Sequence, residues 1–217
     1  DEMSFRFGDL IFFYFLQAVI EDKRAFGIIF NKSRRQGATA KIISSMLNIA
    51  TMYRNKSLGY LSKTSDDVKH LHKFRMVEAL RAMPKMFQPM LQSKDILTKI
   101  FFSEPTKKDD KGFIQKSRGL NTLIDYRATS TSAFDSTRKD FLLLDEVSKF
   151  KPDVNFVELL SRISTTLRQG SRIRGKIFCT STFDPIAGEN FKEVWGNSRY
   201  SKRDLNGQTT SGLYRFF

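Results

Sequence analysis

The segment Phe141-Leu-Leu-Leu-Asp-Glu146 decides the fold, because four consecutive apolar residues end in two adjacent carboxylates. An apolar run of this length is typical of a strand buried in a parallel sheet. Acids at the carboxyl end of such a strand lie at the edge where α/β proteins bind their ligands. Taken alone, the pattern also fits an ordinary strand end or helix start. It predicts an α/β protein with a site at Asp145 and Glu146 if a matching loop lies upstream.

A strand, a loop and a helix precede this segment in the order that a phosphate-binding loop requires. Residues 26–31 form a short apolar run, residues 32–39 a basic loop, and residues 40–52 an amphipathic segment. The segment has the helical spacing that gives one apolar face to pack on a sheet. That predicted face consists of Ile42, Ile43, Met46, Leu47 and either Ile49 or Ala50.

The loop Lys32-Ser-Arg-Arg-Gln-Gly-Ala-Thr39 departs from the standard phosphate loop. The standard loop ends in Gly-Lys-Ser/Thr, with the lysine on the terminal phosphates and the hydroxyl on Mg²⁺. The tripeptide Gly37-Ala38-Thr39 keeps the hydroxyl and lacks the lysine. Either Lys32 folds back over the loop, or Arg34 or Arg35 supplies the charge by bidentate contact. The plain alternative is a solvated basic turn.

The two halves together predict a nucleotide site. The candidate nucleotide-binding residues are Lys32, Ser33, Arg34, Arg35, Gln36, Gly37, Ala38 and Thr39. In P-loop NTPases the first acid of the pair helps to hold Mg²⁺, and the second orients or deprotonates the attacking water. Asp145 is therefore expected to share the metal with Thr39. Glu146 is expected to act on the water at the terminal phosphate of ATP.

These motifs resemble those of the ATPase domain of the large terminase subunit, the DNA-packaging motor of tailed bacteriophages. That family tolerates a phosphate loop whose lysine stands at the front, as Lys32 does here. Residues 141–146 resemble its acidic strand, and Thr180-Ser181-Thr182 resembles its coupling motif on the next strand. Residues 183–195 are similar to the segment that follows that motif. The resemblance spans the chain from about Phe5 to Phe217.

The resemblance implies a fold, an activity and a setting. The fold is an ASCE or RecA-like P-loop NTPase, a three-layer sandwich with a mostly parallel central sheet. The activity is hydrolysis of ATP with Mg²⁺, which powers translocation of viral double-stranded DNA into a procapsid. The implied partners are double-stranded DNA, the portal protein, the small terminase subunit and further copies of this chain in a ring. The implied location is the host cytoplasm, docked on the procapsid.

An arginine that acts across a subunit interface is also implied. The family often presents it just before the acidic strand, where this chain has Asp135-Ser136 in place of the usual Arg-Gly pair. Arg138 is the shifted candidate, and Arg162 and Arg168 are its competitors. A positive group there would stabilise the charge that develops during phosphoryl transfer.

Domain organisation follows from length and from the same resemblance. A chain of 217 residues that is 40% hydrophobic suits one α/β domain. We expect a helical segment at 1–25, a P-loop core at 26–200, and the start of a linker at 201–217. Terminases usually add a nuclease domain built on several carboxylates. Because no acid follows Asp204, DNA cleavage is expected to be absent from this chain.

Composition favours a polyanionic partner. The formal net charge is +14, which suggests nucleic acid or an anionic membrane surface, and the nucleotide motifs favour nucleic acid. The amphipathic residues 5–20 are too short and interrupted to cross a bilayer, so a helix packed on the sheet is expected. Cys179, the one cysteine, excludes an internal disulfide and lies in an apolar strand. His70 and His72 offer no persuasive zinc site.

The remaining elements are predicted from local patterns. Residues 57–62, 96–102 and 121–128 are expected to be strands. Prolines between 83 and 89 should end a helix that begins near Ser65 or Asp66, either of which can cap it. The basic residues 104–119 form either a solvated loop or a nucleic-acid contact. The predicted apolar face of that helix contains Val68, Leu71, Phe74 and Val77.

Two other functions remain open. A helicase or another DNA translocase of the P-loop class shares most of these features, and the front lysine argues for a terminase instead. A nucleic-acid-binding module on a degenerate NTPase fold, without hydrolysis, is the other alternative. It draws its support from Ala38 at the standard lysine position.

Overall fold

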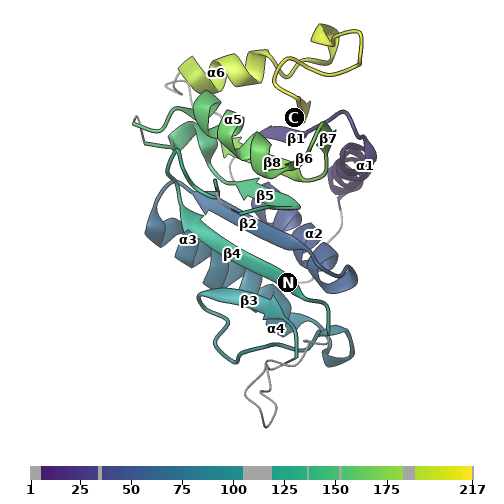
Figure 1. Ribbon diagram of the computed structural model, residues 1–217, viewed down its shortest axis with the longest axis vertical. Helices are drawn as coiled ribbons and strands as arrows, with labels where there is room; N and C mark the ends of the chain where they lie inside the picture. Colours follow the sequence, from purple (N-terminus) through teal and green to yellow (C-terminus); the bar gives the residue numbers. More distant parts are fainter. Residues whose placement is uncertain are drawn as a thin grey trace.

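A seven-stranded sheet forms the centre of the computed structural model, in the order β3-β4-β2-β5-β8-β1-β9 (Figure 1). All neighbouring strands pair in parallel except β3 and β4. The structure describes residues 6–33, 36–104, 119–135, 137–151, 153–182 and 189–216. The strands are β1 (Gly27–Lys32), β2 (Ser57–Ser62), β3 (Lys99–Phe102), β4 (Thr122–Ala128), β5 (Phe141–Leu144), β8 (Lys176–Thr182) and β9 (Leu213–Phe216). The predicted mostly parallel α/β sheet is confirmed.

Strand β5 lies in the middle of this sheet, between β2 and β8. All four of its residues are buried. Because successive side chains of a strand point to opposite faces, Phe141 and Leu143 enter one core, and Leu142 and Leu144 enter the other. Burial on both faces explains the uninterrupted apolar run, and it fixes where Asp145 leaves the strand.

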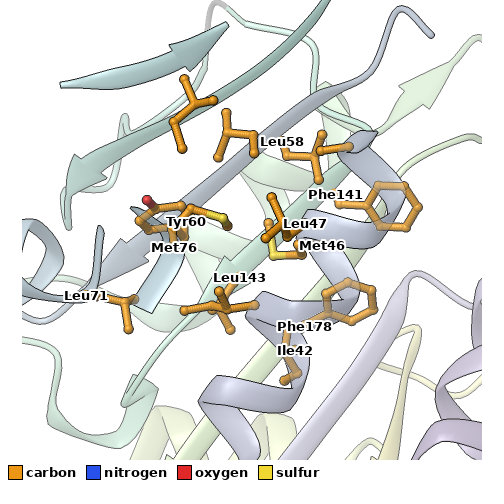
Figure 2. Packing of buried hydrophobic residues seen from close by; sticks show 14 of the residues in the cluster. Ile42, Met46, Leu47, Leu58, Tyr60, Leu71, Met76, Phe141, Leu143 and Phe178 are labelled. Carbon is orange, nitrogen blue, oxygen red and sulfur yellow. The ribbon is translucent and has the colours of Figure 1, made fainter. Parts of the chain in front are cut away.

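Helices cover both faces of the sheet, as the predicted three-layer sandwich requires (Figure 1). Side chains of α1, α2, α3 and α4 share one core, and side chains of α5 and α6 share the other. In the first core Ile42 and Met46 of α2 pack near Leu143 and Phe178 of the sheet (Figure 2). The helices are α1 (Phe7–Glu21), α2 (Ala38–Met52), α3 (Ser65–Leu71), α4 (Glu78–Ala82), α5 (Phe156–Thr166) and α6 (Glu189–Gly196).

Helix α1 packs on the sheet, as predicted for the amphipathic opening. Phe12, Leu16 and Val19 are its buried residues. The Phe12 ring stacks on Phe30 of β1 at a centroid distance of 5.4 Å. Within the described ranges, no helix has the length and apolar character to cross a bilayer. These contacts make α1 part of the core on one face of the sheet.

The segment expected to begin a linker instead contributes to the sheet. Residues 213–216 form β9, which pairs in parallel with β1 through Gly27 to Phe30. Arg215 reaches back to α6, where its Nε donates to the Trp195 carbonyl at 2.6 Å. These four residues complete an edge of the sheet.

Three local predictions need correction. Thr64, not Ser65 or Asp66, caps α3, because its hydroxyl accepts a hydrogen bond from the Asp67 amide at 3.1 Å. Strand β3 begins at Lys99, three residues after the predicted start. Phe74 is 49% exposed and does not belong to the buried face. The expected loop at 104–119 falls mainly outside the described residues.

A π-helical turn at His72–Val77 explains the misplaced face. Its wider winding shifts the apolar stripe, so that His72 and Met76 are buried beside Val77, and Phe74 is not. The His72 Nε2 donates to the Ile96 carbonyl at 2.7 Å. Its Nδ1 then accepts from the Tyr60 hydroxyl. Burial lowers the pKa of His72, so the neutral ring is the form that fits this core.

This histidine predicts acid-dependent stability. Because its pKa is lower in the folded chain than its usual value of about 6.5, the unfolded chain binds more protons between those two values. The free energy of unfolding should therefore fall as the pH is lowered from about 6.5 towards the folded pKa. Urea unfolding across this pH range measures the slope. His72→Phe should reduce this slope. The matched control, His70→Phe at an exposed position, should leave it unchanged. Equal slopes in the wild type and both variants would contradict the assignment.

Candidate nucleotide site

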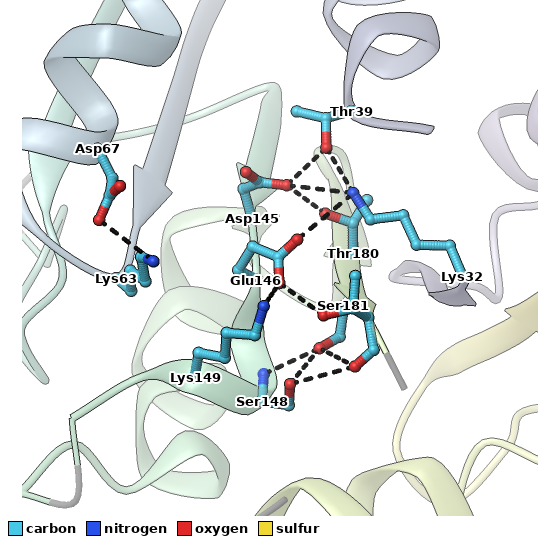
Figure 3. Close-up of polar contacts among 11 residues, drawn as sticks. Lys32, Thr39, Lys63, Asp67, Asp145, Glu146, Ser148, Lys149, Thr180 and Ser181 are labelled. Atoms are coloured by element: carbon cyan, nitrogen blue, oxygen red, sulfur yellow. Dashed lines mark hydrogen bonds and ion pairs between the residues drawn. The ribbon is translucent and has the colours of Figure 1, made fainter. Parts of the chain in front are cut away.

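Four of the predicted site residues lie together at the carboxyl ends of β1 and β5, beside the end of β8 (Figure 3): Lys32, Thr39, Asp145 and Glu146. Lys32 is the last residue of β1, and its side chain is only 9% exposed. Its Nζ donates to Thr39 Oγ1 at 2.8 Å. The same Nζ lies 3.9 Å from Asp145 Oδ1 and 3.7 Å from Glu146 Oε1. Lys32 therefore faces the acidic pair.

Thr39 and Asp145 are separated by 106 positions in sequence and are in direct contact. The Thr39 hydroxyl donates to Asp145 Oδ1 at 2.8 Å. Thr39 lies in the first turn of α2, and the Asp145 amide extends the pairing of β5 by donating to the Leu61 carbonyl at 3.0 Å. A hydroxyl beside a carboxylate is an oxygen donor set that suits Mg²⁺. No group of three or more His, Cys, Asp or Glu side chains suited to a metal occurs among the described residues.

The start of α2 differs from a standard phosphate loop, because the position of the usual lysine is occupied by Ala38. Gly37 precedes the helix in the left-handed conformation, with φ at 71°. Ala38, at the position of the standard lysine, is fully buried. The first amides of a helix have no partners within the helix and favour anions. Gln36 and Ser33 are exposed, and Arg34 and Arg35 lie outside the described residues.

Glu146 has an unusual backbone conformation. Its φ is 56° and its ψ is 45°, in the left-handed region that costs a non-glycine residue about 1–2 kcal/mol. The conformation ends β5 and begins the short helical turn Val147–Lys149. It also directs the carboxylate towards Thr182, whose hydroxyl donates to Glu146 Oε2 at 3.0 Å. Strain of this kind is found at functional sites.

The protonation of Glu146 is set by opposing effects. Burial favours the neutral acid and by itself would raise its pKa. Hydrogen bonds from Lys149 and Thr182 and the positive charge of Lys32 outweigh burial, and they hold the pKa below its usual value. The carboxylate is therefore ionised at neutral pH, which is the form that can accept a proton from water.

The predicted coupling triplet divides between two partners. Thr180 donates to Asp145 Oδ1 at 2.6 Å, and Thr182 donates to Glu146. Ser181 points to the other side of β8, where its Oγ accepts from the Ser148 amide at 3.2 Å. All three residues belong to β8 itself rather than to a turn after it. The two threonines thus touch both acids of the pair.

Lys149 is a site residue that the sequence patterns did not reveal. Its Nζ lies 2.8 Å from Glu146 Oε2, on the side of the carboxylate away from Lys32 (Figure 3). The spacing of three residues was visible in the sequence. The contact requires the left-handed Glu146 and the short helical turn that follows it, neither of which the sequence pattern predicted.

Removing Lys149 should shift the pH dependence of the site. In Lys149→Ala, the Glu146 pKa should rise, because burial is then opposed by fewer positive partners. The acidic limb of a pH–rate profile for ATP hydrolysis should move to higher pH. Lys151→Ala, two residues away and exposed, is the matched control. An unshifted profile in Lys149→Ala would show that this ion pair does not set the ionisation of Glu146.

The arginine candidates lie away from this cluster. Arg138 is exposed and precedes β5, so it lies at the opposite edge of the sheet from Glu146. Arg162 is on α5 and bonds Glu158 at 2.8 Å and Asp135 at 3.2 Å. Arg168 lies over the Phe26 ring at 4.7 Å. Arg138 and Arg168 therefore lie before β5 and β8, at the end of these strands opposite to Asp145 and Thr182.

Solved structures share this architecture. The ATPase domain of the Thermus phage P74-26 large terminase has 14% sequence identity and a TM-score of 0.59 over 93% of this chain and 78% of its own. The HK97 bacteriophage large terminase has 14% identity and a TM-score of 0.53 over 79% of this chain. This chain has the fold of a large terminase ATPase domain. The predicted three-layer arrangement with a mostly parallel central sheet is thereby confirmed.

The likeness to terminases is one of fold rather than sequence. No protein-family model and no curated protein matches the sequence. The chain spans about a third of the HK97 large terminase, of which it covers 32%. The large terminase of a thermophilic bacteriophage, in complex with ADP, has 12% identity and a TM-score of 0.50 over 88% of this chain and 48% of its own. Terminase ATPase domains thus share the layout of the sheet and its helices with this chain.

Proposed function

We propose that this chain binds and hydrolyses Mg-ATP, and that hydrolysis drives viral double-stranded DNA into a procapsid as the motor domain of a large terminase. The observation that carries the proposal is the contact of Lys32, Thr39 and Asp145 beside Glu146. A basic side chain, a hydroxyl and two carboxylates at one sheet edge are the groups that phosphoryl transfer needs. A similar fold in complex with ADP supports a nucleotide as the ligand.

Each group has its own task in this proposal. The Lys32 ammonium contacts the terminal phosphates, and the first amides of α2 contact the phosphates beside them. Thr39 and Asp145 would hold Mg²⁺, which neutralises the charge on the phosphates when it is bound. Glu146 orients the attacking water and accepts its proton. Thr180 and Thr182 hold the two carboxylates and pass changes at the phosphate to β8.

The assembly is proposed from the same family. Subunits form a ring on the portal protein, with the small terminase subunit and DNA as further partners, in the host cytoplasm. Arg138, exposed at the far edge of the sheet, would reach the nucleotide of a neighbouring subunit and stabilise the charge that develops there. The fold that this chain shares with large terminases is consistent with such an assembly.

Mixing two inactive variants tests both the hydrolysis and the ring. Arg138→Ala subunits keep Glu146, and Glu146→Gln subunits keep Arg138. Each variant alone should release phosphate slowly from Mg-ATP, and a mixture should recover part of the wild-type rate if the arginine acts across the interface. If the wild type hydrolyses ATP but the mixture recovers no activity, the trans-acting role of Arg138 is rejected and the hydrolysis proposal stands. Wild-type turnover no faster than that of Glu146→Gln would reject hydrolysis itself.

A further inference from the structure

A large basic groove lies at the opposite end of the sheet from the nucleotide site. It is lined by the hairpin of β6 (Arg168–Gln169) and β7 (Arg172–Ile173), by the turn after α1 and by the loop before β9. Its volume is about 1130 Å³. The hairpin precedes β8, and Thr182 of the nucleotide site is the last residue of that strand. The seven residues of β8 therefore separate the groove from the nucleotide site by roughly 20 Å.

Four exposed cations line the groove: Lys23, Arg168, Arg172 and Arg174. None of its described lining residues is acidic. Within the described part of the chain, none of the four forms an ion pair, whereas neighbouring Arg24 is paired with Asp22 at 2.9 Å. Four like charges that face one groove repel one another unless an anion binds between them. The groove is therefore built for a ligand with several negative charges.

The segments that carry these cations are held in place. The Lys176 ammonium, at the start of β8, donates to the carbonyls of Asp22 and Ala25 at 2.6 and 2.7 Å, which fixes the turn that presents Lys23. Arg168 lies over the Phe26 ring at 4.7 Å. A groove whose cations are positioned before binding loses less conformational entropy when the ligand arrives.

We propose that this groove binds the phosphate backbone of double-stranded DNA. Its lining combines arginines and a lysine with the amide side chains of Gln169 and Gln208, the donor types that contact phosphate and sugar. A nucleoside triphosphate would need cations clustered around one point. These cations are instead distributed over the turn after α1 and the hairpin. The choice of duplex DNA rests on the proposed function, and binding in the groove requires neither ATP nor Glu146.

The test is the salt dependence of DNA binding, measured by fluorescence anisotropy with a labelled duplex, in EDTA and without nucleotide. Each cation that contacts phosphate adds about one to the slope of log affinity against log salt. Lys23→Ala with Arg172→Ala should therefore lower that slope by about two. The matched control, Lys73→Ala with Arg75→Ala, removes the same charge from an exposed site on another face and should leave the slope unchanged.

Two further variants separate the possible outcomes. Lys23→Arg with Arg172→Lys keeps both charges and should retain the wild-type slope. Glu146→Gln should also retain it, so failed ATP hydrolysis and failed DNA binding are distinguishable. Equal losses in the groove variant and its matched control would overturn the proposal, since only net charge would then matter. A groove variant that binds DNA with the wild-type affinity and salt slope would overturn the proposal too.

Discussion

Glu146→Gln is expected to reduce the rate of ATP hydrolysis by about 100- to 10,000-fold, the range for loss of a general base. The affinity for Mg-ATP should remain within a few-fold of wild type, because Lys32, Thr39 and Asp145 are retained. Glutamine keeps the size of the side chain and can still accept from Thr182, so the local fold should persist. Phosphate release measures the rate, and calorimetric titration measures the affinity.

The matched control for this substitution is Glu158→Gln. Glu158 is a half-exposed glutamate on α5, and its partner is Arg162 rather than any residue of the nucleotide cluster. Its replacement should leave hydrolysis unchanged. If Glu146→Gln retains the wild-type rate, Glu146 does not act on the attacking water, and another group must be sought for that role.

Lys32→Ala is expected to weaken ATP binding by about 10- to 100-fold, since a hydrogen bond to a charged group contributes roughly 1.5–3 kcal/mol. The variant also leaves Asp145 and Glu146 side by side with fewer positive partners. The pKa of Glu146 should then rise, because its attraction to the Lys32 charge is lost. Titration with ATP at several pH values measures both effects.

Two comparisons sharpen that result. Lys32→Arg keeps the charge and should retain more of the affinity than the alanine variant. Lys73→Ala removes an exposed lysine from the π-helical turn and should leave the affinity unchanged. If Lys32→Ala binds ATP as tightly as wild type, the loop charge must come from elsewhere, and Arg34 and Arg35 become the candidates to replace next.

The sequence predicted the centre of the fold well, because burial on both faces leaves a strong pattern. The four apolar residues of β5 and the helical spacing along α2 mark elements whose position is dictated by the core. The contact between Thr39 and Asp145 follows from the same logic, since α2 begins and β5 ends at the same edge of a parallel sheet. Local patterns are sufficient where each element is long and buried.

Local sequence patterns did not predict the edge strand β9. It has only four residues, and two of them are half-buried. Its partner, β1, lies almost two hundred positions earlier in the chain, so pairing is decided by tertiary packing rather than by local propensity. A polar segment with Gly207 and Gly212 nearby is also what a linker looks like. The strand therefore depends on contacts that no short window of sequence contains.

His72 and Lys149 escaped prediction for a related reason. A π-helical turn adds a residue to one winding and rotates the buried face, so the regular helical spacing selected Phe74 instead of His72. Lys149 reaches Glu146 only because Glu146 takes the left-handed conformation. Both departures from regular geometry come with specific polar contacts, which sequence periodicity does not encode.

Magnesium-dependent binding of ATP to the wild-type chain, measured by calorimetric titration, tests the nucleotide site most directly, because it requires neither a ring nor DNA. The site geometry predicts saturable binding to one site, weakened when EDTA removes Mg²⁺. It also predicts that Asp145→Asn loses most of this dependence on Mg²⁺, since Asp145 is paired with the Thr39 hydroxyl. Absence of saturable binding to the folded wild-type chain would contradict the assignment of Lys32, Thr39 and Asp145 as a nucleotide site.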